Sequence, residues 1–414
     1  MVKYVGIRND KIVTVSDSPF ESKGMKVVES SSENPISLSK HDRVQKPLNE
    51  MKVAFVGNWK MVCGISTYSE KLWPHVIDGV GHARLFIERN DTPTGPLHLV
   101  GDRTVADEDV VICWKRGEDL KELVKRIDEY DPDIVWVQHE WGLWSNARHW
   151  LSFLSQMRSR RVIVTMHSVF HHRDKTICEA AMPEIVVHLD GAKKVLDDEK
   201  KICGSVSVIP HGCDPCLDRK KLWNLYKSPR TFMQFGFGFR YKGWETSLEV
   251  ARILAGRYED AFFTGLFSES PFNATEHQLY YDELMSFVTK HGLESNVSII
   301  RGFQSVEVLD SYMRTNQAVL FPYTSHPKHE VYGASGAARS AMSKAVPVVT
   351  TSVNHFSDIP TLKADDPKSL AEILDKLFSD PLMKKKQVDK QLKYVEENSW
   401  YNVAQLYLKL FSNS

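Results

Sequence analysis

Short apolar runs separated by helical patterns constrain the fold of this chain more than any other feature of its sequence. Met51–Gly57, Ile134–Gln138 and Val162–Met166 are runs of this kind, rich in β-branched residues, and polar residues do not alternate through them. Strands of that composition are buried on both faces, which is typical of a parallel sheet covered by helices on either side. We therefore predict an α/β protein.

The alternation of strand and helix runs through the chain twice. The first series starts at Met51, and a second begins after Pro215 with Phe232–Phe235 and continues to Val346–Thr350. A chain of 414 residues is also too long for one ordinary core. We predict two Rossmann-like, doubly wound parallel-sheet domains, residues 51–212 and 213–398, facing each other across a cleft that holds the ligands.

Two further segments flank these domains. Residues 1–50 contain short alternating runs broken by turn residues, which predict a small β-rich extension followed by a linker. Residues 399–414 predict a helix that crosses back to the first domain, because its apolar residues share one face and that face must be buried. The members of that face are Trp400, Val403, Leu406, Tyr407 and Leu410.

Composition excludes several classes of protein. The 53 basic and 53 acidic residues cancel, so net charge gives no argument for a nucleic-acid or anionic-membrane partner. No apolar run reaches the roughly 18 residues of a transmembrane helix, and no secretory signal is evident. Six scattered cysteines are typical of reduced thiols, so we expect a cytoplasmic protein. Cys213 and Cys216 lack a second pair at zinc spacing, and we expect no metal.

A phosphate-binding pattern follows the first strand of the second domain. Two glycines lead to Arg240 and Lys242, and Gly243 then opens a predicted helix. Glycines allow a ligand to approach the backbone, and two cations beside a helix N-terminus suit a diphosphate. A glycine-rich turn that merely carries surface cations would give the same pattern.

Two other glycine loops open predicted helices. In the second domain Gly333, Ser335 and Gly336 begin a helix whose free amides can hold a diphosphate or sugar hydroxyls. In the first domain Gly64 precedes a helix start that can receive phosphate or an acceptor hydroxyl. Each loop has a plainer interpretation as a turn whose serine or threonine caps a helix.

Histidines end two strands of the first domain. His139, followed by Glu140, and His167 are placed by the strand pattern at the edge of the cleft. A single histidine at a strand end is more often structural than catalytic, so position alone does not assign either residue.

Taken in order, these motifs resemble those of the retaining glycosyltransferases of family 4, which have the GT-B fold. The resemblance covers residues 51–411 and includes Val206–Asp214, which is similar to the segment that crosses between the domains in that family. It implies that His167 lies beside the reacting sugar and that His139 and Glu140 lie on the acceptor side.

The resemblance also assigns the donor side. It implies that the donor diphosphate contacts Gly64, Arg240, Lys242, Ser335 and Gly336, and that the donor sugar contacts Glu330 and Gly333. The chain departs from the family at Ser340, where a glutamate usually holds the nucleotide ribose. Glu330 stands two residues before the family's other glutamate, which puts the choice of nucleotide in doubt.

The function predicted on this basis is metal-independent transfer of a sugar from a nucleotide-diphosphate sugar to an acceptor hydroxyl, with retention and with no bound cofactor. Neither a pair of carboxylates placed as in a hydrolase nor a D-x-D motif at a strand end is evident. The alternatives are a nucleotide-sugar epimerase of the same fold and a non-catalytic nucleotide-sugar-binding or scaffold protein. The donor sugar, the acceptor (saccharide, lipid, protein or modified nucleic acid) and the oligomeric state stay open.

Overall fold

The computed structural model describes most of the chain, as two compact units. The units are Met1–Lys46 and Pro47–Ser414. The described residues are 3–8, 11–16, 26–30, 46–89, 109–144, 146–170, 183–199, 204–216, 229–270, 273–325 and 330–413.

The first unit contains an antiparallel sheet. Its described strands are β1 (Lys3–Arg8), β2 (Lys11–Ser16) and β3 (Lys26–Ser30), in the order β2-β1-β3. This arrangement confirms the β-rich extension that the alternating runs predict.

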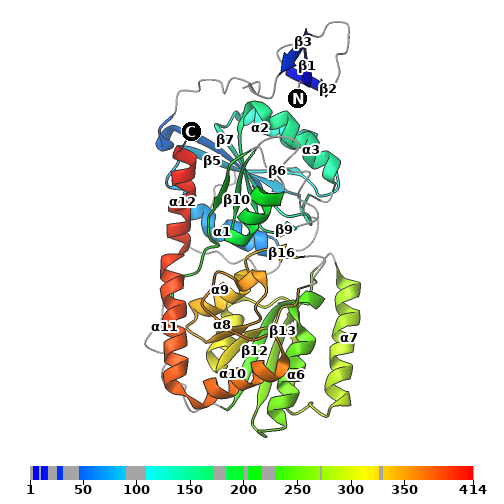
Figure 1. Cartoon of the computed structure of the whole chain (residues 1–414), viewed down its shortest axis with the longest axis vertical. Coiled ribbons are helices and arrows are strands. Elements are labelled where there is room, and N and C mark those ends of the chain that lie inside the picture. The colour runs from blue at the N-terminus through cyan, green and yellow to red at the C-terminus, as the bar shows by residue number, and fades with distance from the viewer. Residues whose placement is uncertain are drawn as a thin grey trace. The chain divides into compact units, whose positions relative to one another are not determined.

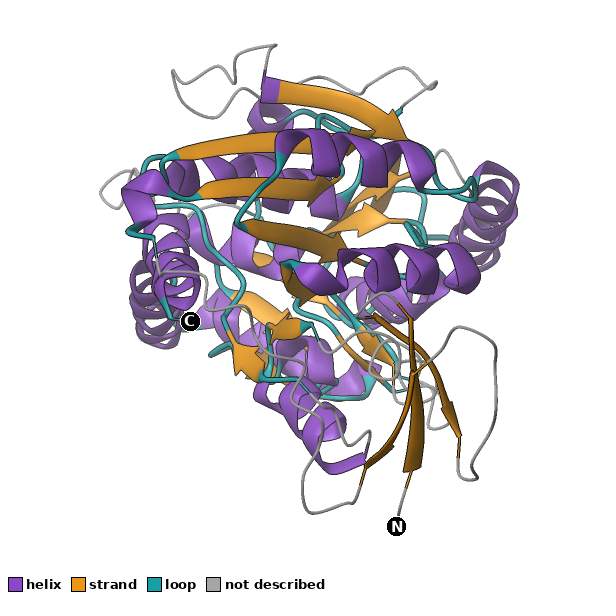
Figure 2. Cartoon of the chain, turned by 90° about the horizontal axis from the view of Figure 1, so that it is seen from above, coloured by secondary structure: helices purple, strands orange, loops and turns teal. Residues whose placement is uncertain are grey.

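The second unit contains two parallel sheets, each with helices on both of its sides (Figure 1, Figure 2). Among the described residues the first sheet has the order β11-β10-β8-β7-β4-β5-β6 and the second the order β14-β13-β12-β15-β17-β18. In both sheets the first strand lies in the middle and the chain winds outward to one side and then to the other. This is the doubly wound topology that the sequence predicts.

The elements have the following bounds. The first half comprises β4 (Lys52–Gly57), α1 (Gly64–Ile77), β5 (His82–Glu88), β6 (Val110–Trp114), α2 (Lys121–Tyr130), β7 (Ile134–His139), α3 (Ala147–Gln156), β8 (Arg161–Met166), β9 (Val169–Phe170), β10 (Glu184–Val187), α5 (Asp190–Lys194) and β11 (Val206–Val208). The second half comprises β12 (Thr231–Phe237), α6 (Trp244–Ala255), β13 (Phe262–Ser268), α7 (Ala274–Lys290), β14 (Val297–Arg301), α8 (Val306–Thr315), β15 (Ala318–Phe321), β16 (Val331–Tyr332), α9 (Gly336–Ser343), β17 (Val348–Thr350) and β18 (Leu362–Lys363). The closing helices are α10 (Pro367–Ser379), α11 (Pro381–Glu397) and α12 (Trp400–Ser412), and single turns of tighter helix include η6 (Arg240–Lys242) and η7 (Asn354–Phe356).

Burial on both faces explains why the strands are continuously apolar. Along β4, Val53 and Phe55 enter the hydrophobic cluster on one face of the first sheet, and Ala54 and Val56 enter the cluster on the other. Successive side chains of a strand point to opposite faces, so a strand with a core on both sides needs apolar residues at every position.

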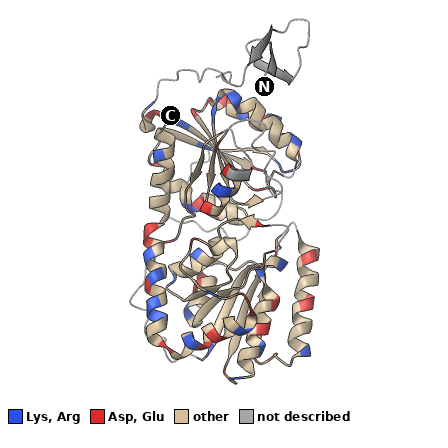
Figure 3. Ribbon diagram, in the orientation of Figure 1, with Lys and Arg blue, Asp and Glu red and all other residues tan. Residues whose placement is uncertain are grey.

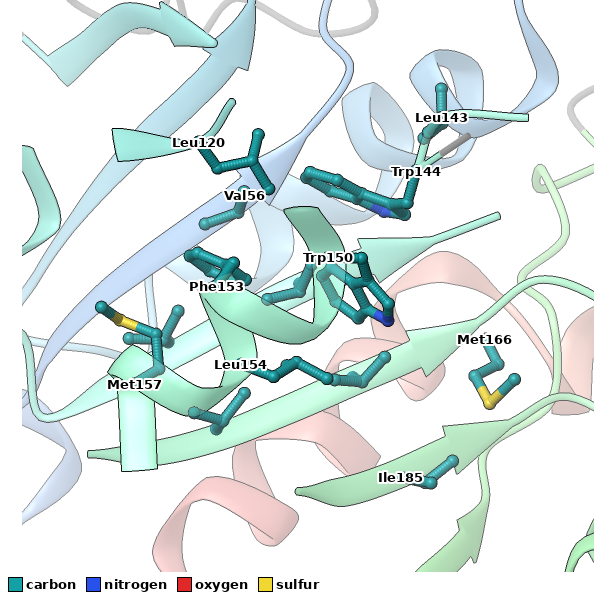
Figure 4. Close-up of a cluster of buried hydrophobic side chains, with 14 of the residues drawn as sticks. Val56, Leu120, Leu143, Trp144, Trp150, Phe153, Leu154, Met157, Met166 and Ile185 are labelled. Atoms are coloured by element: carbon teal, nitrogen blue, oxygen red, sulfur yellow. The ribbon is translucent and has the colours of Figure 1, made fainter. Parts of the chain in front are cut away.

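An aromatic stack in one of these clusters holds the end of β7. Trp144 and Trp150 stack with ring centroids 5.0 Å apart, and Phe153 continues the stack (Figure 4). The indole of Trp144 donates a hydrogen bond to the carbonyl oxygen of Gln138, at 3.0 Å. The stack therefore fixes the strand end on which two of the predicted site residues stand.

The last helix returns to the first sheet. Helices α11 and α12 follow one another along one side of the second unit (Figure 1), and α12 packs against α1. Its buried residues are Trp400, Val403, Ala404, Tyr407, Leu408 and Phe411. The predicted face is wrong at one position, because Leu406 is exposed; the period of 3.6 residues places Ala404 and Leu408 inward instead. Arg161 on β8 donates to the carbonyl oxygens of Leu410 and Phe411 in the last turn of the helix.

The sequence reading did not anticipate helix α11. Its outward face is rich in lysine and carries most of the charge visible along that side of the molecule (Figure 3). Its buried face includes two glutamines, Gln387 and Gln391, which bond to each other and to backbone groups. A polar inner face weakens the periodic signal on which sequence reading depends. Within the described residues, no helix has the length and apolar character needed to cross a bilayer.

We expect Phe411→Ala to lower the free energy of unfolding by about 3–5 kcal/mol, because its ring is fully buried against Trp136. Leu406→Ala is the matched control in the same helix; its side chain is 42% exposed, and we expect a change below about 0.5 kcal/mol. Urea unfolding followed by circular dichroism measures both. Equal losses in the two variants would contradict the return of α12 to the first sheet.

Candidate functional site

The winding of each sheet locates its switch point, where ligands bind in folds of this type. In the first sheet the direction of winding changes between β4 and β7, and in the second between β12 and β15. The predicted site residues follow strands at or next to these points. His139 ends β7, His167 follows β8, and Lys242 lies in the loop after β12.

The loop after β12 depends on a glycine. Gly243 has a left-handed backbone, with φ of 69°, and a Cβ atom there would lie 1.9 Å from the carbonyl oxygen of Pro322. No other residue fits that position without moving the backbone. The close approach brings Lys242 beside Tyr323, which follows β15 on the other side of the switch point.

A chain of polar contacts joins this loop to the start of α9. Lys242 Nζ donates to the hydroxyl of Tyr323 at 2.7 Å, and that hydroxyl lies 3.2 Å from Ser335 Oγ. Ser335 caps α9, accepting a hydrogen bond from the backbone of Ala338. The cation and the helix N-terminus therefore lie at one place, an arrangement that suits an anion.

Lys242 keeps its positive charge in this setting. Burial alone lowers the pKa of its ammonium group, but the phenols of Tyr241 and Tyr323 outweigh that effect and the pKa is raised. Tyr241 also stacks on the imidazole of His355, which gives the loop an aromatic wall.

Arg240 does not join Lys242. Its guanidinium is half exposed and binds the carboxylate of Glu283 on α7 through two hydrogen bonds, at 2.7 and 2.8 Å. The reason is geometric: both residues lie in the turn η6, and a 3₁₀ turn rotates residues two apart to different sides. The structure thus brings Lys242 and Ser335 together and leaves Arg240 elsewhere.

Glycines let α9 approach the first half of the unit. A Cβ at Gly333 would lie 2.9 Å from the carbonyl oxygen of His167, and one at Gly336 would lie 3.3 Å from Nε2 of His211. Next to this contact, β16 pairs with β9 in an antiparallel bridge between the two halves. The predicted donor loop and the predicted catalytic histidine are therefore neighbours.

His167 belongs to a cluster of three histidines packed around Tyr68 of α1. The ring centroids of His167, His188 and His211 lie 4.7, 5.2 and 5.1 Å from that of Tyr68. Burial, first of all, lowers the pKa of each histidine: well below the ordinary value for His167 and His211, and to about 4 for His188. The three rings are therefore neutral near pH 7. Among the described residues no group of three potential ligands could hold a metal ion.

His139 and Glu140 lie in different surroundings. His139 is fully buried against Trp141 and Trp150, and neither ring nitrogen has a hydrogen-bond partner among the described residues. Glu140 is half-buried and lies near enough to Tyr241 for its carboxylate to affect the pKa of that phenol. Of this predicted acceptor pair, the structure leaves Glu140 accessible and His139 enclosed.

The remaining predicted residues lie at the surface. Gly64 is exposed at the first position of α1, where the Sγ atom of Cys63 accepts a hydrogen bond from the Ser66 amide, and a Cβ at Gly64 would meet nothing within 4 Å. Glu330 is exposed, and its carboxylate accepts a hydrogen bond from the hydroxyl of Tyr332. In the part of the chain that the structure describes, neither residue hydrogen bonds to Lys242, Tyr323 or Ser335.

Sequence reading missed one buried charge beside the site. Arg339 on α9 is 1% exposed; it donates to the carbonyl oxygen of Ser335 at 3.1 Å and pairs with Asp358, which Tyr394 also contacts. The Asp358 carboxylate and these contacts keep the pKa of Arg339 raised despite burial. An arginine in a helix is normally solvated, so nothing in the sequence signals this role.

Comparison with solved structures shows that the fold is GT-B. The chain is similar to the trehalose-6-phosphate protein of E. coli bound with UDP-2-fluoro glucose (TM-score 0.66, 11% identity, covering 88% of this chain and 99% of that one). It is also similar to HepE from Anabaena in complex with UDP (TM-score 0.64, 13% identity, 88% and 100%) and to sucrose-phosphate synthase from Thermosynechococcus elongatus (TM-score 0.64, 18% identity, 88% and 100%).

No protein-family model and no curated protein matches the sequence. The structural neighbours are glycosyltransferases, and at these identities they establish the fold alone.

Because the histidines of the site are buried and neutral, we expect the free energy of unfolding to fall in acid. Burial lowers the pKa of His139 from 6.5 to about 3, so between those values the unfolded chain binds a proton that the folded chain does not. The contribution of His139 to the free energy of unfolding is therefore complete above the ordinary pKa of 6.5 and is lost as the pH falls toward about 3. We expect His139→Phe to reduce the slope of unfolding free energy against pH by up to about 1.4 kcal/mol per unit between about pH 6 and pH 4.

Urea unfolding over that pH range checks this prediction. Each variant is compared with its own stability at about pH 8, which removes any constant difference in packing. Parallel profiles for the two proteins would show that His139 titrates normally in the folded state.

Proposed function

We propose that this protein is a retaining glycosyltransferase that moves a sugar from a nucleotide-diphosphate donor to an acceptor hydroxyl without a metal ion. The observation that carries the proposal is the meeting of two environments at the facing edges of two doubly wound sheets. One is cationic, formed by Lys242 and the N-terminus of α9, and the other is a set of neutral histidines that includes His167. A diphosphate attached to a sugar matches that pair of environments.

The first environment serves the leaving group. As the bond from sugar to phosphate breaks, negative charge grows on the diphosphate, and Lys242 and the amides of α9 are already oriented toward such charge. Tyr323 and Ser335 hold the lysine at the helix start. UDP and UDP-2-fluoro glucose bound to proteins of this fold support a nucleotide sugar as the donor.

The second environment serves the sugar. Cleavage gives the sugar oxocarbenium character, and a neutral imidazole beside it hydrogen bonds without adding repulsion. The acceptor oxygen bonds to the anomeric carbon on the same face from which the diphosphate departs. The leaving phosphate takes the proton of that hydroxyl, and the configuration is retained. We assign Glu140 to the acceptor side, and its partial burial near Tyr241 of the second half supports that assignment.

One panel of reactions tests this function. The full chain is incubated with individual nucleotide sugars, with and without candidate acceptors and with and without EDTA. Nucleoside diphosphate release and the anomeric configuration of the product are measured. Acceptor-dependent release that survives EDTA and gives a retained product is expected. Interconversion of the sugar nucleotide without release indicates an epimerase, and binding without turnover indicates a non-catalytic protein.

Lys242→Ala should weaken binding of the nucleoside diphosphate by about 1.5–3 kcal/mol, the range for a hydrogen bond to a charged group. Arg240→Ala is the matched control two residues away, because its guanidinium is occupied by Glu283. We expect the control to change the binding free energy by less than about 0.5 kcal/mol. Isothermal titration calorimetry measures both, and a Lys242→Ala protein with unchanged affinity would reject the assignment.

His167→Ala should lower kcat on the order of a hundredfold and leave the affinity for the nucleoside diphosphate nearly unchanged. The backbone of His167 adjoins Gly333 of the proposed donor loop, and its ring does not belong to the chain from Lys242 to Ser335. In this proposal its loss therefore acts on the reaction and not on phosphate binding. Steady-state kinetics and calorimetry on the same preparation separate the two effects. Full activity in a folded variant would remove His167 from the mechanism.

A further inference from the structure

The histidine cluster contains a directed chain of hydrogen bonds. Nδ1 of His188 lies 2.9 Å from the carbonyl oxygen of Ile209, and its Nε2 lies 3.4 Å from Nδ1 of His167. On the far side of that ring, Nε2 of His167 lies 3.0 Å from the side-chain amide of Gln138. The chain therefore runs from the backbone that leaves β11, through His188, to His167.

The carbonyl of Ile209 fixes every proton along this chain. A carbonyl oxygen only accepts, so Nδ1 of His188 must carry a hydrogen. A neutral imidazole has one N–H, which leaves Nε2 of His188 as an acceptor. Nδ1 of His167 must then be the donor in the contact between the two rings, and Nε2 of His167 keeps its lone pair.

The amide of Gln138 fits this assignment in one orientation. The structure has the amide oxygen of Gln138 facing His167 Nε2, at 3.0 Å. A lone pair on Nε2 needs a donor, so the assignment requires the oxygen and the nitrogen of the amide to be exchanged. The amide nitrogen is buried without a hydrogen-bond partner among the described residues, so the exchange breaks no hydrogen bond of that nitrogen.

We infer that His188 is a positioning residue that holds His167 as the Nδ1–H tautomer, with the Ile209 carbonyl as the anchor. The effect of this tautomer on sugar transfer rests on the proposed function. The assignment of the tautomer itself does not. In this tautomer His167 Nε2 accepts a hydrogen bond from a sugar hydroxyl, which replaces the Gln138 amide when the donor binds. An Nε2–H tautomer would place a donor there instead.

The anchor also connects the site to the crossing between the two halves. Ile209 precedes Pro210 and His211 at the start of the segment that leaves the first half. Gly212 in that segment packs against Trp400 so closely that a Cβ would lie 2.2 Å from the indole. The carbonyl that sets the tautomer is therefore held by the same backbone that joins the halves.

Nitrogen-15 NMR of the full chain labelled at histidine tests the assignment directly. His167→Gln identifies the signals of His167 by their loss. In the wild type we expect His167 and His188 each to show a protonated Nδ1 and an unprotonated Nε2 at neutral pH. An Nε2–H form of His167 in the wild type would overturn the inference without any variant.

Two variants of His188 separate positioning from simple packing. His188→Phe fills the site but offers no acceptor, and we expect His167 to lose the Nδ1–H tautomer. We expect kcat to fall by roughly tenfold to a hundredfold, with KM for the nucleotide sugar changed by less than about twofold. His188→Gln places an amide oxygen near the former Nε2, and we expect it to keep the tautomer and recover most of the lost kcat.

His139→Phe is the matched control, because it replaces a buried histidine of the same sheet whose ring nitrogens have no hydrogen-bond partner among the described residues. The backbone hydrogen bond from His167 to the carbonyl oxygen of His139 does not depend on that side chain. We expect it to leave the His167 signals unchanged. An unchanged tautomer in His188→Phe would overturn the inference. If the tautomers are as assigned but no nucleotide sugar is turned over, the proposed function fails and the positioning role of His188 stands.

Discussion

A chain of buried hydroxyl groups ties the last helix to the first sheet, and the geometry of the site depends on it. The indole of Trp136 donates to Thr165 at 2.9 Å, the Thr165 hydroxyl lies 3.0 Å from that of Tyr407, and the Tyr407 hydroxyl lies 3.0 Å from that of Tyr68. Removing one hydroxyl of this chain leaves its neighbour without a hydrogen-bond partner, and an unpaired buried hydroxyl costs about 1–3 kcal/mol. Tyr68 is thereby fixed in place, and the three histidines pack around its ring.

The chain passes between the two halves of the second unit twice, and the start of α12 brings both passages together. The backbone of Cys213, in the outgoing segment, bridges to Ser399 at the start of α12. Asp214 accepts hydrogen bonds from the indole of Trp400 at 2.9 Å and from Lys71 of α1 at 2.5 Å. The segment that leaves the first half and the start of α12, which returns to it, are therefore bonded to each other and to α1. This junction lies next to Ile209 and His211 in the chain.

The sequence predicted the parts of the fold that burial dictates, and it missed those decided by partners far along the chain. The strands and the return of α12 were predictable because a run such as Ile134–Gln138 has one way to be buried. The pairing of Arg240 with Glu283 was not predictable, because Glu283 comes 43 residues later and a turn decides which side each cation takes. His188 directly follows β10, but its role depends on a backbone carbonyl and on a second ring, which the sequence does not bring together. Arg339 gave no signal, since only the folded structure removes it from water.

Charge differs sharply between the two ends of the candidate site, and the surroundings of the ionisable groups are the cause at both. At the phosphate end, two phenols keep the pKa of Lys242 raised although burial opposes it. At the sugar end, burial is the largest cause that lowers the pKa of His167 and His188. No carboxylate is among the causes at His167, and at His188 the opposing effects of the Ile209 carbonyl and of Asp358 do not reverse the shift. A cation at the sugar end would repel a sugar that is losing its leaving group, and a neutral residue at the phosphate end would leave the departing charge unmatched. In the function that we propose, this difference would orient the donor, with its diphosphate toward α9 and its sugar toward His167.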